Sequence, residues 1–442
     1  MSGPVQYRPT GRTASEIAAS FESAIERGTL VAGDRMPSVR ALAATLEVSP
    51  STVASALREL RRRGLIVSHE RSGSRVSERP PVAGPRGSAQ VPPGVQDLAS
   101  GNPDPTLLPD LNAALKRVEL PQRLYGAAPA VDELLAIAGR AFAADGISAR
   151  HLCVVSGALD GVERVLGANL RQGDRIALAD PGYTGLVDLV RALGLVPRPV
   201  AIDEHGLLPD ALARVLAGGA EAVLLSPRGH NPTGAALDSD RASALSSVLE
   251  RRPQALVIED DHLGAVSGSR AHTVTGDRER WAVIRSVGKT LGPDLRVAAL
   301  AGDPRTVSRV EGRLLVGPGW VSHLLQRVVV ELWSDAATRA LLDRATSIYA
   351  DRRMALLAAL AEREIAAVGS SGSNVWVPVA EESPVVDSLL QAGIAVRAGT
   401  PFRIESPPAV RVTTAALPVG RAEPVADAVS RALRPAQRTR AA

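Results

Sequence analysis

Lysine is rare in this chain, and one lysine stands where it could do covalent chemistry. Only Lys116 and Lys289 are lysines among 51 basic residues, so arginine fills nearly every position where any cation would serve. Lys289 follows an apolar strand pattern at residues 281–284 and stands in a loop of small residues. An amine there can form an imine with an aldehyde, which a guanidinium cannot do. Lys289 is therefore the first candidate for catalysis.

A second apolar strand pattern, at residues 256–258, runs into acidic residues upstream of Lys289. A buried Asp260 could pair with a protonated pyridine nitrogen. This pairing would allow the pyridine ring to act as an electron sink. Acidic strand ends and loop lysines are each common on their own. Together and in this order, they indicate pyridoxal 5′-phosphate (PLP) as the cofactor.

Further residues could hold the same cofactor. A strand pattern at residues 152–155 runs into small residues that open a helix, which aims backbone N–H groups and a hydroxyl at a phosphate. An arginine could add a forked contact to the phosphate, and a tyrosine could stack on the pyridine ring. We therefore expect the phosphate near Ser156, Gly157, Ala158, Ser286 and Arg296, the ring face near Tyr183, and the ring hydroxyl near Asn231.

The elements that must position these residues alternate along the chain. Apolar strand-like runs at residues 152–155, 175–179, 222–225, 255–258 and 297–300 are separated by helix patterns. This alternation is typical of an α/β domain with a largely parallel sheet. Residues 80–96 contain five prolines and three glycines and indicate a flexible linker. We expect an N-terminal domain at 1–79, the main domain at 97–434, and a disordered tail at 435–442.

The N-terminal domain has the pattern of a winged helix-turn-helix, an α+β fold. A helix pattern with Ile17 and Phe21 on one apolar face precedes two short helix patterns, the second of which Ser49 could cap. Two short strand patterns around a glycine-bearing turn follow them as a wing. Residues 1–80 hold 12 arginines and 8 acidic residues, whereas the remainder is balanced. A basic module of this kind favours DNA as its partner over the alternative, a generic helical bundle.

This N-terminal segment resembles the winged-helix reader of the GntR superfamily of bacterial regulators over about residues 13–77. The resemblance lies in the runs at residues 33–43, 48–53, 57–60 and 64–66. Pro50 and Ala54 stand where many relatives carry arginine, so fewer side chains can reach base edges. In that family the residues that meet DNA correspond here to Arg40, Ser49, Ser51, Thr52 and the wing-tip Gly73.

Residues 97–434 resemble fold-type I PLP enzymes of the aspartate aminotransferase superfamily. Ser-Gly-Ala, Pro-Gly-Tyr, Asn-Pro-Thr-Gly, Asp, Ser-x-x-Lys and a late Arg occur in the order of that superfamily. The resemblance implies that Arg411 binds a carboxylate of the effector and that Tyr125 reaches the phosphate of a partner subunit. His262 stands where many relatives carry a tyrosine against the ring hydroxyl. Thr184 and Gly185 directly follow Tyr183, so no second arginine stands there to bind a carboxylate of the effector.

A winged helix linked to this fold resembles the MocR-type branch of GntR regulators, with features of a PtsJ-like subgroup linked to vitamin B6 metabolism. The resemblance implies a regulator that binds operator DNA, senses PLP or an amino-acid adduct of PLP, and forms a head-to-tail homodimer. At most, we expect a slow aminotransferase half-reaction. The alternatives are a working aminotransferase with an accessory DNA-binding domain and a DNA-binding scaffold that has lost its ligand.

The sequence also bears on where in the cell such a protein works. No apolar run approaches the roughly 18 residues that span a bilayer, and the N-terminus has no apolar signal core. We therefore expect a bacterial cytoplasmic protein without a membrane partner, associated with the nucleoid when bound to DNA. The single cysteine, Cys153, cannot form an internal disulfide, and the histidines are not spaced as metal ligands.

Overall fold

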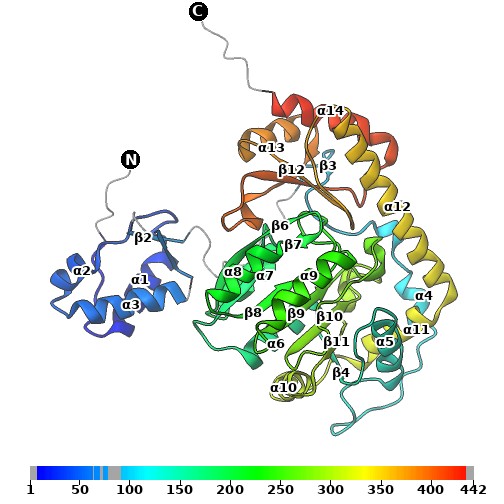
Figure 1. Ribbon diagram of the computed structural model, residues 1–442, viewed down its shortest axis with the longest axis horizontal. Coiled ribbons are helices and arrows are strands. Elements are labelled where there is room, and N and C mark those ends of the chain that lie inside the picture. The colour runs from blue at the N-terminus through cyan, green and yellow to red at the C-terminus, as the bar shows by residue number, and fades with distance from the viewer. Residues whose placement is uncertain (1–6, 63, 70–72, 78–90, 435–442) are drawn as a thin grey trace, which may run out of the picture. The chain divides into compact units, whose positions relative to one another are not determined.

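The computed structural model describes residues 7–62, 64–69, 73–77 and 91–434, and Figure 1 shows its ribbon. Residues 7–77 contain three helices and an antiparallel hairpin, the predicted winged helix-turn-helix. The chain turns between the second and third helices at Glu47, whose φ of 54° is left-handed. The elements of this reader are α1 (Ala14–Glu26), α2 (Val39–Leu46), α3 (Pro50–Arg62), β1 (Ile66–His69) and β2 (Gly73–Val76).

The reader has a hydrophobic core of its own. Helix α1 begins at a capping box, in which Thr13 and Glu16 each accept a hydrogen bond from the other's backbone N–H. Its apolar face packs against α3, and α2 packs against α3 from another side. Fully or almost fully buried members of this core are Ile17, Phe21, Leu42, Val53, Leu57, Leu60 and Val76.

An eight-stranded sheet forms the centre of the larger part of the chain, in the order β4-β11-β10-β9-β8-β5-β6-β7. Strands β8, β9 and β10 are parallel neighbours, whereas β11 runs antiparallel to both β10 and β4. The fold is therefore the predicted α/β class. The strands are β4 (Leu152–Val155), β5 (Arg175–Asp180), β6 (Val196–Asp203), β7 (Gly206–Leu207), β8 (Ala220–Leu225), β9 (Leu256–Asp261), β10 (Trp281–Ser286) and β11 (Ala298–Gly302).

Helices follow most strands of this sheet. All six residues of β9 are buried, as expected of a central parallel strand covered on both faces. One hydrophobic cluster joins Phe142, Leu212 and Leu245 from three helices to Val223 and Val257 of the sheet. The helices are α4 (Leu111–Leu115), α5 (Asp132–Ala144), α6 (Ala158–Asn169), α7 (Thr184–Ala192), α8 (Pro209–Ala217), α9 (Ser239–Glu250), α10 (Pro304–Leu315), α11 (His323–Ser334) and α12 (Ala336–Ala361).

A smaller α/β layer is built from the C-terminal residues and one short strand that precedes the large sheet in sequence. The 26-residue helix α12 packs against both α11 and α14 and joins the two layers, as Figure 1 shows. Strand β3 pairs in parallel with β13, and a three-stranded sheet has the order β12-β15-β14. These elements are β3 (Gln96–Asp97), β12 (Asn374–Pro378), α13 (Glu382–Gln391), β13 (Ile394–Ala395), β14 (Arg397–Ala398), β15 (Ala409–Thr413) and α14 (Ala422–Leu433).

Helix length and hydropathy also bear on membrane contact. In the parts of the chain that the structure describes, no helix is both long enough and apolar enough to cross a bilayer.

Candidate cofactor cavity and nucleic-acid interface

A cavity of about 300 Å³ lies at the carboxyl ends of the parallel strands, where it is also lined by residues of the smaller layer. Ligands of open parallel sheets bind at this edge, because loops from several strands meet there. The cavity brings together residues that are more than 250 positions apart in sequence. Its lining includes Ala158, Tyr183, Asn231, Asp260, His262, Ser286, Lys289, Arg296 and Arg411 of the predicted set.

Asp260 is the buried carboxylate of the cavity. It lies on β9 and is 3% exposed, and its Oδ2 is 3.7 Å from Nδ1 of His262. Among the described residues, its Oδ1 has no hydrogen-bond partner. Burial raises the pKa of Asp260, opposed by the imidazole of His262. A cationic N–H donor in the cavity would stabilise the ionised form of this buried carboxyl group.

Lys289 lies in the turn that follows β10 and lines the same cavity. Its Nζ donates a hydrogen bond to the carbonyl oxygen of Gly101 at 2.8 Å. Burial lowers the pKa of the Lys289 amine, and the positive charge of Arg411 adds to that shift. A lowered pKa increases the neutral fraction of the amine, which is the form that attacks an aldehyde.

The opposite end of the cavity is suited to a phosphate. Ser286 ends β10, and Arg296 holds a left-handed backbone with φ of 46°, which is uncommon outside glycine. Arg296 Nη2 donates to the carbonyl oxygen of Ser156 at 3.2 Å. A Cβ atom at Gly157 would lie 3.0 Å from this guanidinium, so glycine allows the arginine to approach. Ser156 and Gly157 are close to Arg296 but are not among the residues that line the cavity, whereas Ala158 at the start of α6 lines it.

Arg411 is a buried cation, 4% exposed, on β15. Its Nη1 donates to Oδ1 of Asn231 at 3.0 Å, and its Nη2 donates to the carbonyl oxygen of Ala99. Burial lowers the pKa of Arg411 to about 10. The backbone of Gly101 passes close to this guanidinium, because a Cβ atom there would lie 3.1 Å from Nη2. No carboxylate balances Arg411 through a contact within the described chain, so an anionic ligand is a fitting partner.

These groups fit PLP. The unpaired oxygen of Asp260 supplies the acceptor that a protonated pyridine needs, and Lys289 supplies the amine for the aldehyde. Ser286, Arg296 and the start of α6 supply donors for the phosphate. When bound, PLP supplies an electron sink for chemistry on amino acids.

The structure adds cavity residues that the motifs did not identify. Tyr349 of α12 belongs to no recognisable sequence motif. It nevertheless lines the cavity, and its hydroxyl accepts a hydrogen bond from the backbone N–H of Asp104 at 3.1 Å. Tyr125 lies away from the cavity, 93% exposed and edge-on to Trp320. Residues that the sequence analysis did not predict and that line the cavity include Ser100, Gly101, Pro103, Tyr349, Ser373 and Asn374.

The reader presents a polar face at the start of α3. Ser49 Oγ accepts a hydrogen bond from the backbone of Thr52 at 3.1 Å, which confirms its capping position. Its hydroxyl also lies 2.7 Å from that of Ser51 and 2.8 Å from that of Thr52. Arg40 on α2 and Gly73 on β2 are exposed, and the φ of Gly73 is 82°. Hydroxyls at a helix start beside an exposed arginine can bind phosphates and base edges.

Two further arginines lie on the reader, Arg75 in the wing and Arg35 in the segment that precedes α2. Arg35 and Arg75 form an isolated backbone bridge, and Nη1 of Arg75 donates to the carbonyl oxygen of Gly33 at 2.8 Å. These contacts tie the wing to the segment that precedes α2. They place cationic side chains on the same basic module as Arg40, which favours contact with a polyanion.

Comparison with known families divides the chain in the same way. Residues 13–76 match the gntR family of bacterial regulatory proteins. Residues 97–429 match the family of class I and II aminotransferases.

Individual relatives combine these two parts or share the second. The vitamin B6 salvage pathway transcriptional repressor PtsJ of Salmonella typhimurium is 40% identical over 411 residues, which cover 92% of this chain and 95% of the repressor. The pyridoxine biosynthesis transcriptional regulator PdxR of Corynebacterium glutamicum is 28% identical over 58% of each chain. Among solved structures, the α-aminoadipate aminotransferase LysN of Thermus thermophilus, in complex with N-(5′-phosphopyridoxyl)-L-leucine, has a TM-score of 0.68 at 22% identity and covers 77% of this chain and 92% of its own.

Proposed function

The chain belongs to the class I and II aminotransferase family and carries a gntR-family reader, and on this premise we propose that it is a PLP-responsive transcriptional regulator of vitamin B6 metabolism. It acts in the bacterial cytoplasm, where the reader binds operator DNA. The cavity binds PLP or an amino-acid adduct of PLP. Two relatives named for vitamin B6 regulation support the pathway.

One observation carries this proposal. A single chain contains a basic reader and a cavity in which an amine, a buried carboxylate and phosphate donors converge. Lys289, Asp260 and Arg296 supply these three groups. A DNA-binding domain serves no step of transamination, whereas a ligand site on the same polypeptide lets a regulator couple ligand binding to DNA binding.

The segment that joins the two parts offers a route for the signal. The carbonyl oxygens of Ala99 and Gly101 accept hydrogen bonds from Arg411 and Lys289. A ligand carboxylate at Arg411 competes with Ala99 for the same donor. Because these residues follow the linker in sequence, a shift of this segment would move the point from which the linker to the reader starts. A ligand acts in this way only if it prefers one of the two arrangements.

A homodimer is part of the proposal. Large apolar side chains are exposed at the end of α10 and on the segment between α4 and α5, including Leu124, Leu315 and the C-cap residue Val316 at 81%, 68% and 88%. Exposed apolar residues of this size mark protein contact surfaces when they gather on one face. A second copy of the chain in head-to-tail orientation would cover them and bring Tyr125 toward the partner's phosphate site.

A second candidate function is a working aminotransferase. The presence of Lys289, Asp260 and Arg411 in one cavity favours it, because these are the groups that transamination requires. The sequence that follows Tyr183 is Thr-Gly and provides no second carboxylate anchor. Loose positioning of a substrate costs much of the rate, so we expect only a slow half-reaction.

DNA selection and a turnover assay separate the two functions. We expect the purified full-length chain to enrich a specific duplex from a random-sequence pool, and turnover with a panel of amino acids and keto acids to stay negligible. Steady multiple turnover by a chain that enriches no sequence would establish the aminotransferase instead.

A further inference from the structure

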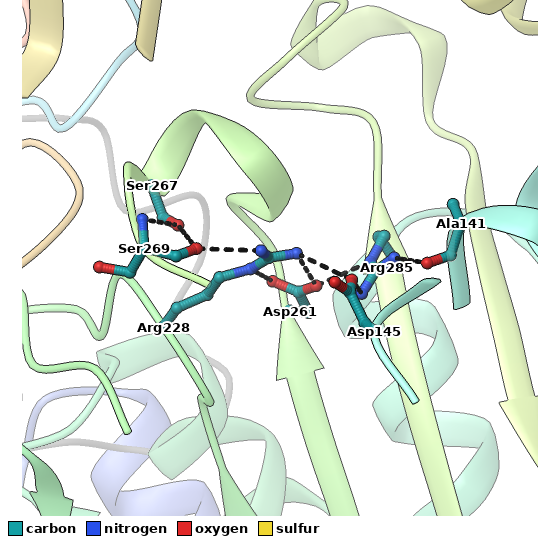
Figure 2. A network of polar contacts seen from close by, with 7 residues as sticks. All are labelled: Ala141, Asp145, Arg228, Asp261, Ser267, Ser269 and Arg285. Carbon is teal, nitrogen blue, oxygen red and sulfur yellow. Dashed lines mark hydrogen bonds and ion pairs between the residues drawn. The ribbon is translucent and has the colours of Figure 1, made fainter. Parts of the chain in front are cut away.

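A cluster of four charged residues lies next to the cavity and has no part in the contacts described above (Figure 2). Arg228 forms two parallel hydrogen bonds with Asp261, from Nε to Oδ1 at 2.9 Å and from Nη2 to Oδ2 at 2.8 Å. Arg285 donates from Nε to Oδ2 of Asp261 at 2.7 Å and from Nη2 to Oδ2 of Asp145 at 2.6 Å. We call Asp145, Arg228, Asp261 and Arg285 the arginine clamp.

Two members of the arginine clamp are buried, the other two, Arg285 and Asp145, are 12% and 20% exposed, and each arginine also contacts a backbone carbonyl. The side chain of Asp261 is 1% exposed and that of Arg228 is 6% exposed. Arg228 Nη1 donates to the carbonyl oxygen of Ser269 at 3.1 Å, and Arg285 Nη1 donates to that of Ala141 at 3.2 Å. Figure 2 shows these carbonyls at the two ends of the network. The clamp thus connects strands β9 and β10, the segment after β8 and the end of α5.

A gain in folding stability does not by itself explain why the chain contains such a cluster of charges. Removing two guanidiniums and two carboxylates from water is costly, and apolar side chains of similar volume often stabilise a protein as well or better. A forked arginine contact does fix geometry, because its donors satisfy a carboxylate in one orientation. A cluster with balanced charge therefore holds its strands in one arrangement.

Three of the four segments that carry the clamp also carry a cavity residue, and only the end of α5, with Asp145, does not. Asp261 follows Asp260 on β9, and successive side chains of a strand point to opposite faces. Arg285 directly precedes Ser286 on β10, at the start of the turn to Lys289. Arg228 likewise stands three residues before Asn231.

The clamp also affects the charge beside the cavity. Burial raises the pKa of Asp260, and the negative charge of Asp261 adds to that rise. The guanidiniums of Arg228 and Arg285 hold the pKa of Asp261 low and offset its charge.

We propose that the arginine clamp fixes three of the segments that carry the PLP ligands, so that Arg228, Asp261 and Arg285 are positioning residues for a cofactor that they do not touch. This inference rests on the PLP binding proposed above. It adds to that proposal a set of positioning residues on the face of the sheet opposite to Asp260 and Ser286.

The test compares Arg228→Met and Arg285→Met with a matched control, Arg241→Met. Arg241 also forms a two-point contact with an aspartate, Asp203, at 2.8 and 2.7 Å, and binds backbone carbonyls, but it does not line or adjoin the cavity. For each full-length variant, the dissociation constant of PLP, the visible circular dichroism of bound PLP, and the melting temperature without PLP are measured.

We expect PLP to bind about tenfold to a hundredfold more weakly to both clamp variants, with altered circular dichroism, because small misplacement of a site has effects of this size. Arg241→Met should bind PLP with the affinity of the wild type, and its melting temperature should fall less than that of the clamp variants, because Asp203 is 39% exposed. Arg285→Lys should recover part of the affinity, since it restores the charge without the fork.

Unchanged PLP affinity and circular dichroism in both clamp variants, with a lower melting temperature, would show that the cluster only supports the fold. If the methionine variants do not fold, Asp261→Asn replaces them, because it keeps the shape and removes the charge. Wild-type affinity in Asp261→Asn would likewise overturn the inference. A wild-type chain that fails to bind PLP would instead overturn the proposed function itself.

Discussion

The reader and the cavity hold their functional side chains in opposite ways. In the reader, Arg40 and Ser49 are exposed, and the hydroxyl contacts of Ser49 are to residues within three positions. In the cavity, Asp260 and Arg411 are buried, and Arg411 contacts residues 180 and 312 positions away. The reader is a local motif, whereas the cavity depends on the whole fold.

This difference teaches where substitutions act. An exposed side chain of the reader such as Arg40 can be removed without leaving a buried group unpaired, so the effect is confined to DNA binding. A buried charge of the cavity shares its partners with other charges, and its removal alters them as well. The predictions below test this contrast, starting with the largest effect.

Replacing Lys289 with alanine should abolish covalent PLP binding while the fold survives. One amine carries the bond, and no second lysine lines the cavity in the part of the chain described here. Borohydride reduction followed by peptide mapping checks this, with Lys116→Ala as the control. A PLP adduct that persists after reduction of Lys289→Ala would remove Lys289 from the site.

Asp260→Asn should weaken PLP binding by about 3–5 kcal/mol, the cost of removing one partner of a buried ion pair. The amide keeps the shape of the carboxylate but cannot neutralise a protonated pyridine. Titration of the visible absorbance with PLP measures the loss. An affinity like that of the wild type would mean that Asp260 does not face the ring nitrogen.

Glu259, the neighbour of Asp260, should make stability depend on pH. Burial raises the pKa of Glu259 from 4.5 to about 7, so the folded chain binds a proton that the unfolded chain releases. Stability relative to Glu259→Gln should therefore fall as pH rises from 4.5 to 7, by up to about 3 kcal/mol. Denaturant unfolding at several pH values checks this, with the exposed Glu119→Gln as control. A constant difference from the wild type across this range would contradict the prediction.

Arg40→Ala should weaken operator binding by about 1–3 kcal/mol and reduce its salt dependence by about one ion. The reader should remain folded, because Arg40 is exposed on α2. Fluorescence anisotropy at several salt concentrations measures both quantities. Arg140→Ala removes an equally exposed arginine from α5 and serves as the control. If both variants bind like the wild type, Arg40 makes no DNA contact.

The same contrast explains what could be predicted from the sequence. The helices of the reader follow from caps and apolar spacing, and the strand that carries Asp260 follows from its apolar run. The carbonyl acceptors of Ala99 and Gly101 have no side-chain signature, so no motif could indicate them. The arginine clamp joins Asp145 to residues more than 80 positions away, and only the folded sheet reveals it.

Operator affinity measured with and without PLP tests the regulator most directly. The wild type and Lys289→Ala are titrated onto a duplex that the wild-type chain itself has selected, each with and without saturating PLP. We predict that PLP changes the affinity of the wild type several-fold and leaves that of Lys289→Ala unchanged. Equal operator affinity of the wild type in both states, with Lys289 shown to carry PLP, would contradict a regulator that senses PLP.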